Sequence, residues 1–560
     1  MHSGWARRRL QFRTLYRVFL LRVVDLELLS ADGDPTKLIG QFATIFVTIS
    51  SFFTLPALLP LLGTASFPGT EGWTPEHFFI ETAMTCAGLI AVLNWEAAFP
   101  DKRDLLVLAP LPVRKSTLFL AKVAALFAAP ALAMVALNIF SGVVWPFLFR
   151  SDSGGFLGVL RAWPAYWITV FVAGGFLVLA ILTLQGLAAN LLPRQLFLRF
   201  SAVLQAAVMC TLMIVYFIEP SLESPAALAA AQNQRMLAWL PSYWFLALFN
   251  QLNGSMDPVL VPLAKRAWIG LGVSALGACT ALLLCYFRLM RRMVEQPDIL
   301  PQTRFVSWSP QFGNSLTGAI TRFSMRTLLR SRQHRMILSF YLGIGITIVV
   351  GYVKVTNRGF GSTRGTVSNS FLFASILMMI LTALALRVVA SIPISLPANW
   401  IIRITQVRSA KDYHRAIRWS WLTLGVAPVL VSIAAFLLAA SPWRPALGHF
   451  CVMFWLGILL VEICLYTLRK IPFTCSYLPG KAGIHIAFWV CVIFFLRLLH
   501  DAAELEGRLL HRLLGGIMMV VIVALAAIGM RHLGASRAAL TEELLFEEAY
   551  PAEVTSLGLN

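Results

Sequence analysis

The sequence lacks the short motifs with which proteins usually bind nucleotides or hold catalytic metal ions. To form a phosphate-binding loop, Gly480-Lys481 would need a glycine at position 475 and a serine or threonine at position 482. The chain has Cys475 and Ala482 there. The nine histidines form no HExxH pattern, and the eight cysteines form no CxxC pair. We therefore expect no catalytic, cofactor-binding or metal-binding residues, and no enzymatic activity in this chain.

Charged residues are also scarce. They make up 13% of the chain against 58% hydrophobic residues, with a mean hydropathy of +0.75. This is too little charge for a soluble protein of 560 residues. The net charge of +20 would suggest a nucleic-acid partner in a soluble protein. In a membrane protein it is explained by basic loops on the cytoplasmic side, so we expect no nucleic acid.

Long apolar segments recur along the whole chain. A helix of roughly 20 apolar residues crosses the ~30 Å hydrocarbon core of a bilayer, because its backbone satisfies its own hydrogen bonds. The sequence predicts an all-α polytopic integral membrane protein with about twelve transmembrane helices in two six-helix halves. The expected spans are 38–62, 77–97, 118–142, 166–187, 201–218, 264–287, 336–353, 370–395, 419–440, 448–468, 482–497 and 513–530.

The distribution of basic residues predicts the orientation. With the N-terminus in the cytoplasm, 32 of the 46 Lys and Arg residues lie in cytoplasmic segments, 9 lie outside and 5 lie within spans. Such an asymmetry places both termini in the cytoplasm. The N-terminal segment has no apolar core or cleavage site of a secretory signal, which favours the plasma membrane of a bacterium, its inner membrane.

A basic amphipathic segment precedes the first span. Its apolar residues recur at helical spacing, and arginines lie on a neighbouring face. The apolar residues are Trp5, Phe12, Tyr16, Phe19, Val23 and Leu26. Such a helix either lies along the inner leaflet, in contact with membrane lipids, or packs on the protein's own surface. The predicted domains are an elbow segment 1–37, a first half 38–290, a basic linker and second elbow 291–335, a second half 336–530 and an acidic cytoplasmic tail 531–560.

Two sequence features support the division into halves. Phe323–Phe340 repeats the arginine-rich amphipathic pattern that opens the chain, and Asn94-Trp95 is echoed by Asn399-Trp400. Each Asn-Trp pair lies at the cytoplasmic end of the second expected span of its half.

The loop between the second and third spans is the most distinctive. A charged turn is followed by a short apolar stretch that ends in Pro110 and Pro112, within Asp101–Pro112. An apolar element rimmed by charge is typical of a docking surface. With this loop, the N-terminal elbow, the six-span half and the segment Ile471–Gly480, the chain resembles the permease subunits of ABC-2-type exporters.

The resemblance implies partners and sites. Two copies of a separately encoded ABC ATPase would bind ATP and dock under the cytoplasmic loops, while the sequence does not indicate the cargo. The implied coupling residues are Asp101, Lys102, Arg103, Asp104, Leu105, Leu108, Arg403 and Arg408. The resemblance also implies that a helix in the outer segment Glu219–Pro262 caps the path. Anchoring at the membrane interface is the alternative for that segment.

Ionisable residues inside spans are costly and face protein or water. The candidates are Glu81, Glu96, Lys122, Arg387 and Glu462. In one interpretation these side chains form ion pairs within the protein or extend to the lipid headgroups. In the other they line a path for the substrate. Two other functions stay open. An ion-coupled secondary transporter would use these residues as coupling groups and have broken spans. An intramembrane lipid-processing enzyme would need paired acids, or His with Ser or Cys, at one depth.

Overall fold

Every regular element in the described part of the chain is a helix. The computed structural model describes residues 2–24, most of 43–54 with residue 40, and then 74–95, 113–148, 155–219, 222, 225–254, 257–295, 316–356, 367–394, 399–400, 410–440, 443–466, 471–474 and 485–540. By contacts between Cα atoms the chain divides into two compact units, 1–300 and 301–560, and each is described by itself.

Eight of the described helices are long and apolar enough to cross a membrane. They are Pro75–Leu93, Ser116–Asn138, Leu160–Leu191, Leu260–Leu284, Asn369–Ala390, Tyr413–Leu438, Trp443–Tyr466 and Leu513–Arg537. Two shorter apolar helices, Val203–Ile218 and Ile337–Val353, match the expected spans 201–218 and 336–353. The protein is therefore a multi-pass helical membrane protein. The expected span 38–62 lies largely outside the described residues.

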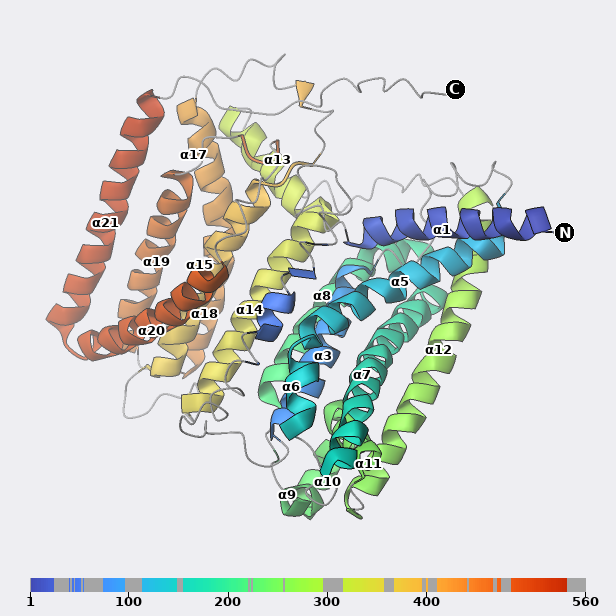
Figure 1. Cartoon of the computed structure of the whole chain (residues 1–560). Coiled ribbons are helices and arrows are strands. Elements are labelled where there is room, and N and C mark those ends of the chain that lie inside the picture. Colours follow the sequence, from blue (N-terminus) through green and yellow to red (C-terminus); the bar gives the residue numbers. More distant parts are fainter. Residues whose placement is uncertain are drawn as a thin grey trace. The chain divides into compact units, whose positions relative to one another are not determined.

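The first unit consists of the helices that Figure 1 colours from blue to light green. In chain order they are α1 (His2–Val24), α3 (Thr74–Leu93), α5 (Lys115–Asn138), α6 (Ser141–Leu148), α7 (Gly155–Leu191), α8 (Arg194–Ile218), α9 (Pro225–Ala229), α10 (Ala231–Leu237), α11 (Pro241–Asn253) and α12 (Leu260–Glu295). The long helix α7 is central and packs against α3, α11 and α12.

Small residues allow α7 and α12 to approach closely. A Cβ atom at Gly186 would overlap Ala281, and one at Gly277 would lie 2.6 Å from Cγ2 of Thr183. Without side chains at these points the two backbones come together, as is usual for helices that pack within a membrane. Another face of α12 exposes Ile269, Val273 and Leu276, which suits contact with lipid.

The amphipathic helix α1 packs against α5. Phe19 is buried with Leu118, Ala121 and Ala125 of α5, and the Lys122 ammonium lies 5.6 Å from the centre of the Phe19 ring. Arg8, Arg9, Arg13 and Arg17 are exposed. Of the two roles expected for the apolar face, packing on the protein's own surface is the one in this structure.

The segment 219–262 folds into short helices at one end of the unit. Phe245, Leu246 and Phe249 of α11 are buried, because α11 packs against α3, α7 and α12. The helix ends at Gly254, which has φ of 101° and whose missing side chain leaves room for the Arg161 guanidinium. Among the aromatic residues of this segment, Trp239 is 85% exposed, whereas Tyr243 is buried.

The second unit consists of α13 (Leu316–Arg330), α14 (Arg332–Thr356), α15 (Asn369–Ala390), α17 (Ala410–Trp421), the π-helical turn η4 (Leu422–Val426), α18 (Ala427–Ala440), α19 (Trp443–Tyr466), α20 (His485–Leu510) and α21 (Leu513–Leu540). The amphipathic helix α13 packs against α17, and α19 packs against α15, α20 and α21.

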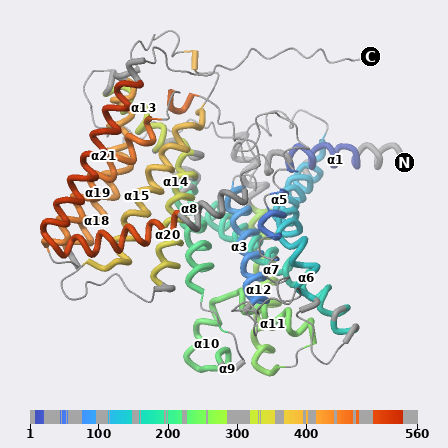
Figure 2. The backbone as a smooth tube through the Cα atoms, turned by 60° about the vertical axis from the view of Figure 1, so that its left-hand side comes forward, coloured from blue at the N-terminus to red at the C-terminus, as the bar shows by residue number. Residues whose placement is uncertain are grey.

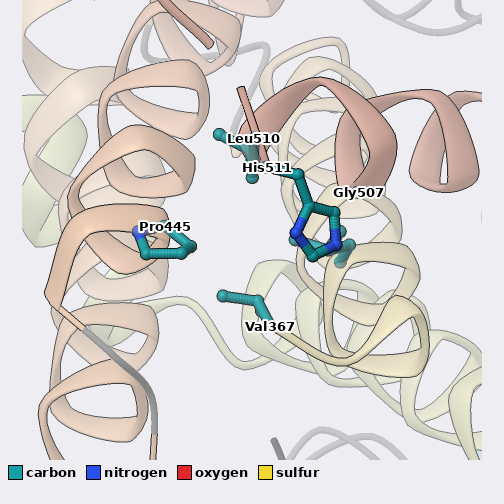
Figure 3. A pocket seen from close by; sticks show the side chains of 6 residues that line it. Val367, Pro445, Gly507, Leu510 and His511 are labelled. Atoms are coloured by element: carbon teal, nitrogen blue, oxygen red, sulfur yellow. The ribbon is translucent and has the colours of Figure 1, made fainter. Parts of the chain in front are cut away.

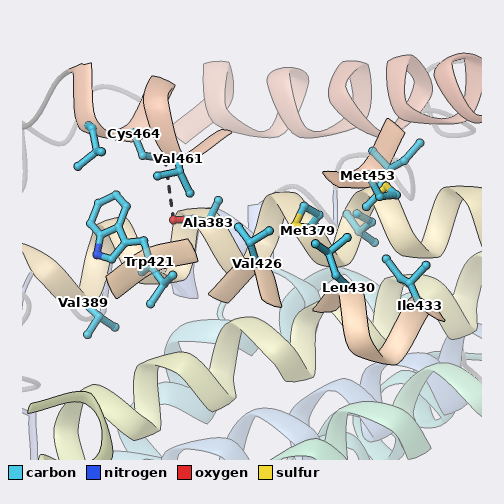
Figure 4. Close-up of a cluster of buried hydrophobic side chains, with 14 of the residues drawn as sticks. Met379, Ala383, Val389, Trp421, Val426, Leu430, Ile433, Met453, Val461 and Cys464 are labelled. Atoms are coloured by element: carbon cyan, nitrogen blue, oxygen red, sulfur yellow. Dashed lines mark hydrogen bonds between the residues drawn. The ribbon is translucent and has the colours of Figure 1, made fainter. Parts of the chain in front are cut away.

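The core of this unit surrounds η4. Trp421, Val426 and Leu430 meet Met379 of α15 and Val461 of α19, as Figure 4 shows. A π-helical turn inserts an extra residue into a helix and often marks a functional position. The third span of this unit, Tyr413–Leu438, therefore contains a π-helical turn between α17 and α18. In the first unit α5 contains Pro130 within the corresponding span.

The helix α20 departs from the sequence prediction. A span was expected at 482–497, but one helix extends from His485 to Leu510 and carries ion pairs such as Arg497–Asp501. Figures 1 and 2 show α20 running across the upright helices of this unit near one end.

The two Asn-Trp pairs are not equivalent in structure. Trp95, shortly after the end of α3, is buried, and its Nε1 donates a hydrogen bond to the Ser201 hydroxyl. In the second unit Asn399 is buried and donates to the Thr474 carbonyl oxygen, whereas Trp400 is 56% exposed. The side chains of the two pairs therefore make different contacts, although both pairs contact a segment that follows the fourth span of their unit.

Candidate functional sites

The first buried polar cluster joins α3 to the end of α8. It consists of His77, Glu81 and Glu219, and we call it the His77 cluster. His77 Nδ1 lies 3.8 Å from Glu81 Oε2, one turn along α3, and His77 Nε2 lies 3.4 Å from Glu219 Oε1. Glu219 is the residue that ends α8, where its backbone N–H donates to Val215. His77 and Glu219 are each 8% exposed.

Residues of α11 hold this cluster in place. The Ser242 hydroxyl donates to Glu219 Oε1, and the Tyr243 ring stacks on the His77 imidazole with 4.1 Å between centres. The Tyr243 hydroxyl in turn accepts the backbone N–H of Leu222 at 3.0 Å. These contacts fix both the ring plane of His77 and the position of the Glu219 carboxylate.

Two further hydrogen bonds tie the same region together. Asn250 of α11 donates to Glu76 Oε2 at 3.1 Å, and Tyr216 and Thr82 share a hydrogen bond of 2.9 Å. Burial acts to raise the pKa of the Glu219 carboxyl, but hydrogen bonds with His77, Glu81 and Ser242 and the charge of His77 lower it below its ordinary value. The geometry thus favours an ionised Glu219.

The second cluster joins three helices of the other unit. It consists of Ser375 on α15, His449 on α19 and Glu506 on α20, and we call it the His449 cluster. Ser375 Oγ lies 2.8 Å from His449 Nε2, and His449 Nδ1 lies 2.7 Å from Glu506 Oε1. His449 and Glu506 are fully buried.

The Ser375 hydroxyl has one proton and two acceptors within reach. It lies 2.8 Å from the Leu372 carbonyl oxygen as well as from His449. If the proton points to Leu372, Ser375 Oγ is an acceptor for His449 Nε2. If it points to His449, Nε2 is the acceptor. The Ser375 hydroxyl can therefore serve His449 as donor or as acceptor.

The order Ser, His, Glu is that of a hydrolase nucleophile, base and orienting carboxylate. The cavity beside the cluster is small, with about 10 Å³ accessible to water, which suffices for about one water molecule. Its lining includes Leu372, Pro445 and Gly507, each close along its helix to a cluster residue, and Figure 3 shows His511 turned toward it. An ester substrate does not fit into this cavity.

Glu462 forms the closest ion pair among the predicted intramembrane charges. Arg418 Nε and Nη2 donate to its two oxygens at 2.5 and 2.9 Å, and the Glu462 side chain is 2% exposed. For Glu462, the structure therefore has the ion pair that was one of the alternatives considered for these intramembrane charges. Lys122 is buried beside Phe19, and Arg387 is half-buried in the last turn of α15. Glu96 lies outside the described residues.

The coupling residues expected from the resemblance also lie outside the described residues. These are Asp101, Lys102, Arg103, Asp104, Leu105, Leu108, Arg403 and Arg408. Sequence reasoning singled out Glu81 but missed His77 and Glu219, and it missed all three residues of the His449 cluster. The spacing of His77 and Glu81, one helical turn apart, was the signal available for the first cluster.

Comparison with family models, with curated proteins and with solved structures gives no match. The fold and these sites therefore define the chain only as a multi-pass helical membrane protein with two buried polar clusters.

Proposed function

We propose that the chain is the membrane permease subunit of an ATP-driven exporter that resembles the ABC-2 type. The ATPase would be supplied by a separately encoded chain, in two copies, and this chain would bind no nucleotide itself. The observation that carries the proposal is a repeated arrangement. In each unit a basic amphipathic helix packs against the third span, α1 on α5 and α13 on α17.

The rest of each unit supports a duplicated six-helix half. In the first unit α7 packs against α3, α11 and α12, and in the second unit α19 packs against α15, α20 and α21. Helices in the same chain order thus have the same neighbours. If the two units are related by duplication, α20 corresponds to α11, because each is the helix that precedes the last span of its unit. The N-terminal part of α20 also covers the expected fifth span of the second half.

An internal duplication of this kind suits alternating access. In transporters built from two similar halves, the substrate path lies between the halves. A motion that rocks one half against the other opens this path to one side of the membrane and closes it to the other. In the proposed exporter the imposed motion comes from closure of the ATPase pair under the loop Asp101–Pro112, and under the loop with Arg403 and Arg408. The protein would lie in a bacterial inner membrane with both termini in the cytoplasm.

Substitutions in the coupling loop test this proposal. Leu105→Asp or Leu108→Asp places a charge on the apolar docking element, so we expect both variants to insert into the membrane and to lose the ATPase on co-purification. Leu544→Asp, the same change in the predicted cytoplasmic tail, is the matched control and should retain it. If both loop variants keep the ATPase and transport, the docking assignment is wrong.

A second candidate function is ion-coupled transport. Two observations favour it: each unit buries a His–carboxylate cluster, and each third span is irregular, at Pro130 and at η4. Buried ionisable groups beside broken helices are typical of sites that carry protons or ions. Transport in proteoliposomes driven by a pH gradient, without any ATPase, would select this function over the exporter.

A further inference from the structure

We propose that the His77 cluster is a binding site for a divalent transition-metal ion, held by one imidazole nitrogen of His77 and one carboxylate oxygen each from Glu81 and Glu219. One ligand atom from each residue lies within 4.8 Å of the other two. The site belongs to the first unit alone and does not depend on the exporter proposal.

The distances approach those of a metal centre. With metal–ligand bonds of about 2.1 Å and tetrahedral angles, neighbouring ligand atoms lie about 3.4 Å apart. His77 Nε2 and Glu219 Oε1 are already separated by 3.4 Å. Glu81 must move closer to complete the set, because the three ligand atoms are spread over as much as 4.8 Å.

The imidazole nitrogen that faces Glu219 has an environment that suits a metal. His77 Nε2 is fully buried and forms no hydrogen bond of normal geometry, although Glu219 Oε1 lies close to it. A buried polar atom without a good hydrogen bond is unfavourable unless something else occupies the gap. A cation between Nε2 and Oε1 would satisfy both atoms.

The residue types lead to the same conclusion. With a metal ion bound, the imidazole and the two carboxylates would act as ligands in their deprotonated forms. A divalent cation would balance the two carboxylate charges in this buried region, where isolated charges are costly. The arrangement of His77 and Glu81 one turn apart on α3 presents both side chains on one face, as in many helix-borne metal sites.

A second layer of contacts orients the ligands. Ser242 donates to the same Glu219 oxygen that faces His77, and Tyr243 stacks on the imidazole. Outer contacts of this kind hold ligands in position and raise metal affinity. One imidazole and two carboxylates suit Zn²⁺, Mn²⁺ or Fe²⁺ better than Ca²⁺, and three protein ligands leave a coordination position for water.

Zinc content of the purified protein tests the proposal. The chain is purified in detergent with a tag that contains no histidine, loaded with Zn²⁺, dialysed and measured by mass spectrometry of metals. We expect one tightly held zinc ion per chain. We expect the content to fall at least tenfold in His77→Gln and in Glu219→Gln.

The chain offers a matched control. His500 and Glu504 of α20 have the same one-turn spacing, with 3.8 Å between Nε2 and Oε1, but both side chains are about one third exposed. Among the residues that the structure describes, no third ligand is grouped with them. His500→Gln should keep the full zinc content. If zinc binding persists in His77→Gln or is lost in His500→Gln, the assignment is wrong.

A measurement on the unaltered protein covers the case in which the variants do not fold. X-ray absorption of the zinc-loaded wild type should show one imidazole and otherwise oxygen ligands in four-coordinate geometry. Absence of bound zinc after dialysis, or a spectrum with several imidazoles or with sulfur ligands, would overturn the proposal.

Discussion

Arg418 of α17 donates two hydrogen bonds to the carboxylate of Glu462 on α19, one to each oxygen. The pair lies between two helices that also contact each other through Trp421 and Val461 in the core of Figure 4. Two parallel hydrogen bonds between a guanidinium and a carboxylate fix orientation as well as distance. The pair therefore sets the register of α17 against α19.

Removing one partner of this pair should be costly. Glu462→Leu leaves the Arg418 charge without its partner in a largely buried place, so we expect a loss of about 3 to 5 kcal/mol in unfolding free energy. The double variant Arg418→Met/Glu462→Leu removes both charges and should recover most of that loss. Thermal unfolding in detergent measures both. Equal stability of single and double variants would contradict a paired role.

The His449 cluster gives a second stability prediction. Glu506→Leu leaves His449 Nδ1 without its acceptor at a fully buried position, and we expect a loss of about 2 to 3 kcal/mol. Glu504→Leu, two residues earlier on α20, removes two partly exposed ion pairs, with Arg508 and with His500, and should cost less than about 1 kcal/mol. Chemical unfolding monitored by tryptophan fluorescence distinguishes them. Similar losses at both positions would argue against the buried network.

Two glycine variants of α7 test its close approach to α12, and we expect only one of them to lower stability. Gly186→Val forces a side chain against Ala281, including its backbone, and should destabilise the first unit by about 1 to 3 kcal/mol. Gly175→Val, on the same helix, adds a side chain where no atom lies within 4 Å and should change stability by less than about 0.5 kcal/mol. Unfolding temperatures in detergent report the difference. A tolerated Gly186→Val would mean that the two helices are not in close contact.

His334 predicts a dependence of stability on pH. It is buried at the start of α14, where its Nδ1 pairs with Ser331 and its Nε2 lies 3.2 Å from the Ile392 carbonyl oxygen. Burial lowers the pKa of His334 below its ordinary value. The unfolded chain therefore binds a proton that the folded protein does not, so this contribution to stability is complete above about pH 6.5 and is lost as the pH falls below it.

The variant His334→Asn isolates this effect. It keeps a donor toward Ile392 but does not titrate, so the wild type should lose more stability than the variant between pH 7 and pH 5.5. For one proton the slope cannot exceed about 1.4 kcal/mol per pH unit. Unfolding temperatures of both proteins across this range give the difference. Parallel curves would show that His334 does not titrate on unfolding.

The sequence predicted helices well where apolar residues alone determine them. The spans at 77–97, 118–142 and 370–395 each correspond to a described helix, because a long apolar segment leaves the backbone no alternative in a bilayer. At α20 the prediction was incomplete. Its N-terminal half is apolar like a span, but His500, Glu504 and Glu506 continue the same helix, and contacts with α15 and α19 direct it across the unit.

The buried polar clusters could not be predicted in the same way. His77 and Glu219 are far apart in the sequence and meet only because α3 packs against α8. Ser375, His449 and Glu506 come from three helices whose packing is decided by apolar neighbours such as Phe371. Local patterns identify which residues are polar within apolar helices. Which of them meet depends on the rotation of each helix about its axis.

Co-purification from the native membrane tests the central claim most directly. The tagged chain is extracted in mild detergent, its partners are identified by mass spectrometry, and the eluate is assayed for ATP hydrolysis. The exporter account predicts two copies of a P-loop ATPase for each chain and ATP hydrolysis in the eluate. An eluate without an ATPase and inert toward ATP would contradict it.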